Sequence, residues 1–244
     1  MPSRSKHDTG FNRKVHLEWL EKTLRMAASG IAFGEIEESL KEDIARENQG
    51  KETIRKVFVH LNRVWLQPPR YCVALRDSAF SMFRDRPESE CAFLLSWGMC
   101  LAAYPFIAHV AEATGRLLRL QGSAQASQIN TRILEQFGDR HFIHRSVRYN
   151  LSMFLDSGVL KESAKRGIYT RGRIVRPRDN KTLSWLVEAL LHSQDDTSMP
   201  VQQIAAHGAL FPFDLDQLTL QTVTVNPRLQ VLRHSLRDTL VTLS

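Results

Sequence analysis

The sequence predicts a mainly α-helical protein organised around one buried helix. Hydrophobic residues make up 43% of the 244 residues and charged residues 24%, which is the composition of a globular chain with enough apolar material for a core. Apolar residues recur at helical spacings of three and four through the first third of the chain. Residues 91–111 contain no Asp, Glu, Lys or Arg, so they predict a helix that is buried on all sides.

Amphipathic helices are expected ahead of that buried stretch, each ending at a glycine, a proline pair or a charged break. The expected helices are Val15–Ser29, a helix around Ile36–Ile44, Glu52–Leu66 and Val73–Phe83. Together with the buried stretch they predict a helical bundle over residues 15–122. Residues 1–14 are polar and basic without an apolar leader segment, and they are expected to form a flexible arm.

The apolar stretch Cys91–Ala111 is long enough to cross a lipid bilayer, so a membrane span is an alternative interpretation. Polar and small residues interrupt it, and Pro105 lies where a spanning helix would need to continue. Many amphipathic helices also surround it in the sequence. We therefore expect a core helix that is kinked or interrupted at Pro105 rather than a membrane span.

Positive charge is concentrated in residues 140–178, and this concentration is the strongest functional signal in the chain. The segment holds ten Lys or Arg against two acids, a net +8, whereas the whole chain carries +7. The remaining residues are therefore nearly neutral in sum. A basic patch confined to one element is typical of a surface that binds a polyanion.

The pattern within and before this segment predicts a particular supersecondary structure. Ser127–Phe137 reads as a helix that ends at Gly138, and a second helix follows with an apolar stripe opposite a basic face. Ser157-Gly158 stops the second helix, and two short strands are expected around a turn at residues 164–167. Helix, break, helix and basic hairpin is the order of a winged helix-turn-helix, so residues 123–178 are predicted to form a winged-helix-like element.

Nine residues of this element are candidate nucleic-acid contacts. The helix is expected to present four of them to a groove: Arg145, Arg148, Tyr149 and Ser152. The hairpin is expected to neutralise phosphates with five more: Lys161, Lys165, Arg166, Arg171 and Arg173. The expected partner is double-stranded DNA. The alternative is an adaptor subunit that docks acidic protein partners through the same surface.

Motifs for catalysis or metal binding are missing from the sequence. It has no glycine-rich phosphate loop and no nucleophile elbow. Cys72, Cys91 and Cys100 lack zinc-site spacing and are expected to be buried, reduced thiols in a cytoplasmic protein. His141 and His144 would need further ligands to hold a metal, so phosphate contact or helix capping is the expected role. We expect a non-enzymatic protein without cofactor, metal or small-molecule substrate.

The last part of the chain, residues 179–244, predicts a small α+β extension. Leu183–Leu191 reads as a short helix, and Phe211-Pro212-Phe213 as an apolar plug that docks on the bundle. Gln217–Val225 is rich in Thr, Val and Leu and predicts a strand. The pattern of Arg228–Leu243 is mixed, and the segment is expected to be helix or strand.

Three segments give the chain a resemblance to a known family. They are KETIRKVFVHLNRVWL (51–66), LLSWGMCLAAYPFIAHV (94–110) and RSVRYNLSMFLDSGVLKES (145–163). In their layout, residues 15–175 resemble the BrxA-type accessory proteins of BREX phage-exclusion islands. The resemblance implies an all-α fold similar to a transcription antitermination helical bundle, and non-enzymatic DNA binding within a multi-protein defence system. It supplies no catalytic motif, and it does not cover residues 176–244.

Overall fold

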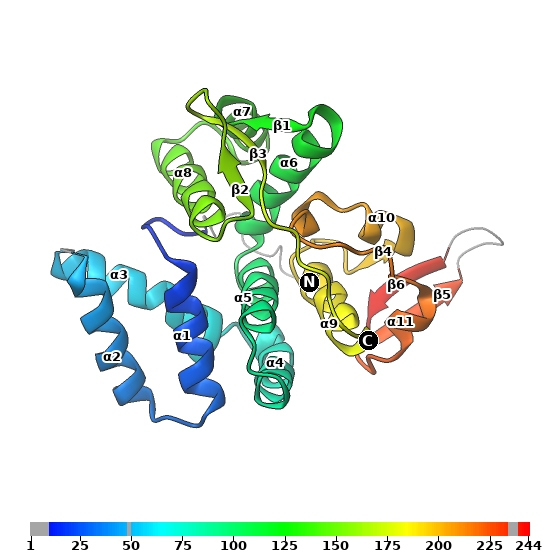
Figure 1. Cartoon of the computed structure of the whole chain (residues 1–244). Helices are drawn as coiled ribbons and strands as arrows, with labels where there is room; N and C mark the ends of the chain where they lie inside the picture. Colours follow the sequence, from blue (N-terminus) through cyan, green and yellow to red (C-terminus); the bar gives the residue numbers. More distant parts are fainter. Residues whose placement is uncertain (1–9, 48–49, 234–238) are drawn as a thin grey trace.

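The computed structural model describes residues 10–47, 50–233 and 239–244, and it confirms a mainly helical protein with two small antiparallel sheets. Figure 1 shows helices α1 to α3 on one side, α4 and α5 in the centre, and the C-terminal helices and strands on the other side. The first helices, whose positions follow the predicted ones, are α1 (Leu17–Ala28), α2 (Phe33–Arg46), α3 (Lys51–Leu61) and α4 (Val73–Asp85).

Helix α5 (Ser89–Ala103) is the centre of the core. Every residue from Ala92 to Ala103 is buried, as a helix without charged residues requires. The helix ends at Ala103, and Tyr104 is not helical. The next helix, α6 (Pro105–Gln121), lies at an angle of 114° to α5. The predicted interruption at Pro105 is therefore confirmed. Among the described residues no single helix has both the length and the hydropathy to cross a membrane, and α5 and α6 reach that threshold only as a bent pair.

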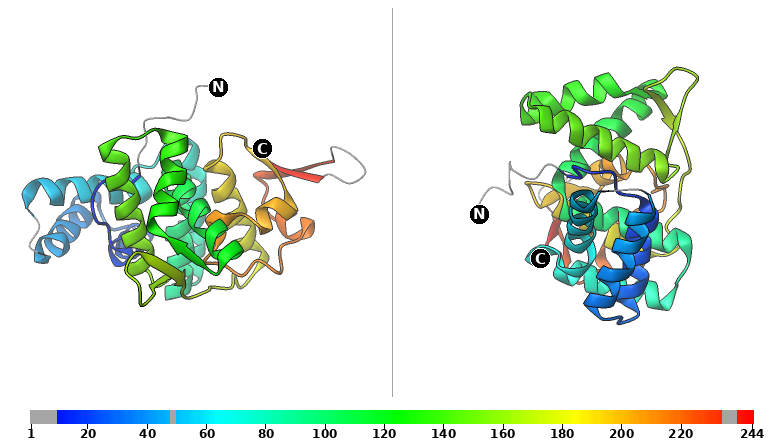
Figure 2. Two further views of the ribbon diagram at one scale, coloured as in Figure 1. Left: turned by 90° about the horizontal axis from the view of Figure 1, so that it is seen from above. Right: turned by 90° about the vertical axis from the view of Figure 1, so that its left-hand side faces the viewer.

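The chain then builds a compact element of two helices and three strands, which stands above the bundle in Figure 1 and in the right-hand view of Figure 2. Its parts are β1 (Ser123–Gln125), α7 (Ala126–Phe137), α8 (His141–Asp156), β2 (Leu160–Glu162) and β3 (Ile168–Arg171). The sheet order is β1-β3-β2, and both pairings are antiparallel. The two helices and the hairpin were predicted, whereas β1 was not.

Helix α9 (Asn180–His192) shares the core of the bundle. Its Trp185 is fully buried and donates a hydrogen bond from Nε1 to the Leu75 carbonyl oxygen of α4, at 2.9 Å. Gly98 of α5 lies directly against that indole, because a Cβ atom there would be 2.5 Å from Trp185 Cζ3. The C-terminal extension is thus anchored in the bundle through its first helix.

The rest of the extension forms a second three-stranded sheet in the order β4-β6-β5. Its elements are β4 (Ser198–Pro200), α10 (Val201–Ala205), a 3₁₀ turn (Gly208–Leu210), α11 (Leu220–Thr224), β5 (Leu229–Arg233) and β6 (Thr239–Leu243). The predicted plug is confirmed, since Phe211 and Phe213 are buried against Trp97 of α5.

The strand predicted over Gln217–Val225 is wrong, because the segment is a loop followed by the short helix α11. The hydroxyl of Thr219 accepts a hydrogen bond from the Thr222 backbone N–H and caps the helix at 3.2 Å. The Thr222 hydroxyl in turn donates to the Gln217 carbonyl oxygen. The hydrogen bonds of Thr219 and Thr222 thus stabilise a helix in a segment whose Thr, Val and Leu content favours a strand.

The segment before α1 differs from the flexible arm expected over residues 1–14. Residues 1–9 lie outside the described residues. Phe11 is fully buried, with its ring 5.1 Å from the His60 ring and 5.3 Å from the Tyr104 ring. The described end of this segment is therefore part of the core at the α5–α6 bend.

Candidate nucleic-acid interface

Helix α8 buries one face and exposes the other, as its sequence pattern predicts. Its inward side chains include Val147, Leu151 and Phe154, and the Phe154 ring lies 4.9 Å from the Trp97 ring of α5. At its C-terminal end, Asp156 forms an ion pair with Lys14 at 3.6 Å, and its carboxylate lies 3.0 Å from His16 Nδ1. These contacts hold α8 in one orientation on the bundle.

The outward face of α8 carries the candidate residues of this helix. Arg145 and Arg148 are exposed, and Tyr149 and Ser152 are partly buried. The Arg148 guanidinium lies 5.2 Å from the centre of the Tyr149 ring, which orients both side chains by a cation–π contact. The structure therefore brings the four predicted residues together on one side of α8.

The hairpin β2–β3 projects its basic turn into solvent. Glu162 accepts a hydrogen bond from the Gly167 backbone N–H at 2.9 Å, and Gly167 adopts the left-handed conformation with φ +77°. The Gly167 carbonyl in turn accepts from the Ala126 N–H at the start of α7, at 2.8 Å. The turn is thus fixed to α7, while Lys165 and Arg166 remain exposed at its tip.

Cations without an ion pair are concentrated in this element, although other described cations, such as Arg70 and Arg84, also lack a carboxylate partner. Eight Lys or Arg lie between positions 140 and 173, and none of them forms an ion pair with a carboxylate within the described residues. Both acids of the same stretch are engaged, since Asp156 pairs with α1-side residues and Glu162 binds the turn. Apart from Arg173, which the nearby carboxylates of Glu21 and Glu90 attract, the positive charge of this element is therefore uncompensated locally.

The last two cations of the basic segment behave differently from the other eight. Arg176 pairs with Asp214, and Arg178 pairs with Glu88 at 2.9 Å. Their partners lie far away in the sequence, so the basic pattern alone did not reveal these pairs. The uncompensated surface consequently ends before Arg176.

Arg173, one of the five predicted hairpin contacts, lies just beyond β3. Its guanidinium stands 4.1 Å from the centre of the Phe93 ring of α5. The side chain is therefore directed back to the bundle rather than along the hairpin. Arg173 keeps part of its surface exposed to solvent, and the other four, Lys161, Lys165, Arg166 and Arg171, are exposed as well.

The connection between α7 and α8 contains polar contacts that the sequence did not indicate. His144 lies 2.7 Å from an Asp139 carboxylate oxygen through Nε2, and 2.8 Å from the Asn130 amide through Nδ1. His144 therefore braces the turn between the two helices. In the part of the chain that the structure describes, no group of three His, Cys, Asp or Glu could hold a metal ion.

Two residues missed by the sequence argument stand at the start of α8. Phe142 is exposed, and the guanidinium of Arg140 lies 5.9 Å from the centre of its ring. The helical pattern places Phe142 one turn before Arg145 on the same side of α8. An exposed phenylalanine at this position was a detectable signal, because it falls outside the apolar stripe.

Two open hollows border this element. One, of about 550 Å³, lies between α6, the end of β3 and residues 202–218, and includes Arg119 and Arg171 in its wall. The other, of about 320 Å³, runs between α6 and α7 past Arg116 and Arg132. Both place further arginines next to the basic element.

Comparison with known proteins identifies no relative of this chain. No family model, no curated protein and no solved structure matches the chain.

Proposed function

We propose that this protein binds double-stranded DNA without catalysing a reaction, and that it serves as an accessory or regulatory component of a larger assembly. The observation that carries the proposal is the group of seven cations without an ion pair between residues 140 and 171, which excludes Arg173 because its guanidinium lies against the bundle. Unpaired cations on one rigid element release counterions when they meet phosphates, which is the main source of affinity for DNA.

The order of elements supports the proposal that residues 105–173 act as a winged helix. Helix α6, β1, α7, α8, β2 and β3 follow one another in the chain, and β1 closes the sheet beside β3. In a winged helix the helix in the position of α8 enters the major groove, and the hairpin lies along the backbone. Arg145, Arg148, Tyr149 and Ser152 would then face the groove, with the two arginines also meeting the phosphates that flank it. Lys161, Lys165, Arg166 and Arg171 would meet phosphates along the backbone.

The layout resemblance to BrxA-type accessory proteins adds a cellular role to this proposal. It favours a cytoplasmic component of a bacterial phage-defence system that works with other protein subunits. This part of the proposal rests on the resemblance and not on the geometry of the site.

The decisive experiment measures binding of the purified protein to an arbitrary DNA duplex across a salt series. If about six cations meet phosphates, the logarithm of the affinity should fall with the logarithm of salt concentration with a slope of about −5. The variant Arg145→Ala with Arg148→Ala should bind more weakly and reduce the steepness of that slope by about 2.

A matched control removes the same charge elsewhere. Arg46 and Arg55 are exposed on α2 and α3, and each pairs with a nearby carboxylate. Changing both to alanine should leave DNA affinity unchanged. Absence of binding at low salt would refute the proposal and favour the adaptor function, in which the same cations dock an acidic protein.

A further inference from the structure

Phe142 is an exposed aromatic ring in the first turn of α8, where packing does not explain it. Its side chain is 44% exposed, and it is not among the residues packed against the core. Phe33 of α2 is similarly exposed, at 43%, but its ring packs on the Phe58 ring at 6.1 Å. The ring contact that the structure gives Phe142 is with the guanidinium of Arg140.

The position of Phe142 on the helix connects it to the candidate interface. Phe142, Arg145, Tyr149 and Ser152 follow one another at spacings of three, four and three, so they form one row along the outer face of α8. Phe142 is the member nearest the N-terminal end. In helices that enter the major groove, the N-terminal residues are the ones that reach base edges.

The chemistry of the ring restricts what it can contact there. A phenyl ring cannot neutralise a phosphate or donate a hydrogen bond to a base edge. The apolar group that a base pair presents in the major groove is the C5-methyl group of thymine. Arg140, whose guanidinium lies over the ring, supplies a positive charge beside it and so keeps this end of the row attractive to the phosphate backbone.

We propose that Phe142 packs against a thymine methyl group in the major groove, so that the preferred ligand is thymine-containing duplex DNA rather than RNA. This inference rests on the proposed function of α8. It also agrees with groove geometry, since the major groove of A-form RNA is too narrow to admit a helix.

The test begins by selecting preferred sequences from a pool of random DNA duplexes with the full-length protein. Each thymine of a selected duplex is then replaced singly by deoxyuridine, which removes only the methyl group. Replacement at one thymine should weaken binding by the wild-type protein about fourfold, the factor expected for one buried methyl-sized group. Phe142→Ala should bind the two duplexes equally.

Controls separate this contact from a general effect on folding or charge. Phe142→Leu retains an apolar group and should retain part of the thymine preference. Phe33→Ala removes the other exposed ring and should keep the full wild-type preference, because α2 lies outside the basic element.

The outcomes distinguish the inference from the function on which it rests. Failure to bind any duplex at low salt would overturn the proposed function. Binding that is insensitive to deoxyuridine at every position, or a penalty that is the same in Phe142→Ala, would overturn the inference and leave DNA binding intact.

Discussion

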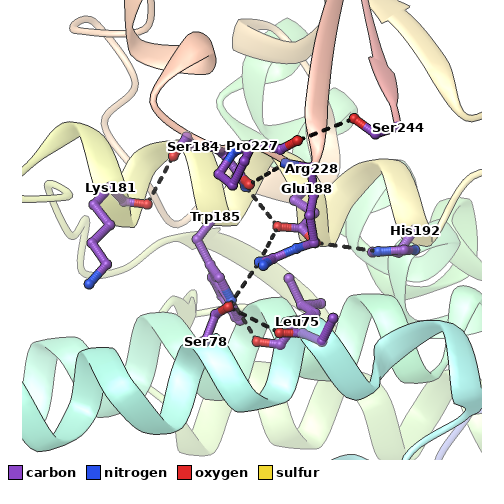
Figure 3. Close-up of polar contacts among 12 residues, drawn as sticks. Leu75, Ser78, Lys181, Ser184, Trp185, Glu188, His192, Pro227, Arg228 and Ser244 are labelled. Carbon is purple, nitrogen blue, oxygen red and sulfur yellow. Dashed lines mark hydrogen bonds and ion pairs between the residues drawn. The ribbon is translucent and has the colours of Figure 1, made fainter.

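The carboxylate of Glu188 on α9 holds the C-terminal strands to the bundle. We can predict how much its removal lowers the free energy of unfolding. Glu188 is 1% exposed and accepts a hydrogen bond from Arg228 Nε at 2.6 Å (Figure 3). It accepts a second hydrogen bond from the Asn226 amide at 2.7 Å. Arg228 also donates to the Ser78 hydroxyl of α4 at 2.9 Å. An ion pair between the buried Glu188 carboxylate and the partly exposed Arg228 guanidinium therefore joins α4, α9 and the segment that leads into β5.

The pKa of Glu188 shows how much its carboxylate contributes to the free energy of unfolding. Burial alone would raise its pKa, but hydrogen bonds from His192, Arg228 and Asn226 outweigh burial and lower the pKa from 4.5 to about 2. A folded-state pKa below the unfolded one stabilises the protein above pH 4.5, and this contribution is lost as the pH falls toward 2. The difference corresponds to about 3 kcal/mol of the free energy of unfolding at neutral pH.

Replacing Glu188 with alanine should cost at least that much. The substitution leaves the Arg228 guanidinium without its carboxylate. Breaking a fully buried pair costs about 3–5 kcal/mol, and because Arg228 is partly exposed to solvent the expected cost is at the lower end, about 3 kcal/mol. Urea unfolding followed by tryptophan fluorescence measures the loss. A control is Arg178→Ala, which breaks an exposed pair with Glu88 and should cost no more than about 1 kcal/mol.

Two further results would refute this reasoning. One is a loss below about 1 kcal/mol for Glu188→Ala, which would mean that the pair does not connect the extension to the bundle. The other concerns Glu188→Gln, which cannot titrate. The stability difference between wild type and this variant should shrink as the pH falls from 4.5 to 2, and a constant difference would contradict the lowered pKa.

Two other predictions concern the turn of the hairpin and the centre of the core. Lys165→Ala with Arg166→Ala should reduce the steepness of the salt dependence of DNA binding by about 2 without changing stability, and an unchanged slope would remove the turn from the interface. Gly98→Ala should lower the free energy of unfolding by about 1–3 kcal/mol, because the new methyl group overlaps the buried Trp185 ring. Urea unfolding checks this, and a neutral effect would mean that the indole moves easily.

The elements that sequence patterns predicted are those determined by residues close to one another in the sequence. The break at Pro105 follows from proline chemistry, and the stripe Val147, Leu151 and Phe154 follows from helical periodicity. The hairpin turn at residues 164–167 likewise needs only its own residues. Each of these was confirmed because no distant contact competes with the local preference.

The elements that escaped prediction depend on distant partners. Strand β1 is three residues long and exists because Ala124 pairs with Tyr169 of β3. Helix α9 was expected, but its place in the core depends on the contact between Trp185 and Leu75, 110 residues apart. Local patterns carry no information on such pairings.

The same distinction applies to the candidate site. Its cations could be located from composition alone, and the outward face of α8 from periodicity. The contact of Arg173 with Phe93 could not be foreseen, because Phe93 lies in α5, outside the basic segment. Phe142 could have been noticed as an apolar residue off the stripe, but only its exposure in the folded structure distinguishes it from a core residue.

Helix α6 packs in the bundle and also leads into the basic element. This limits how a bound DNA could be oriented relative to the bundle. Its start packs at the α5 bend, its end leads into β1, and Gly115 meets Gly208 so closely that a Cβ atom would lie 2.1 Å from the Gly208 oxygen. The basic element therefore cannot swivel independently of the bundle. With DNA bound as proposed, helices α1 to α3 would therefore lie at a fixed angular position around the double helix. A DNA site displaced by half a helical turn would place these helices on the opposite side of the duplex.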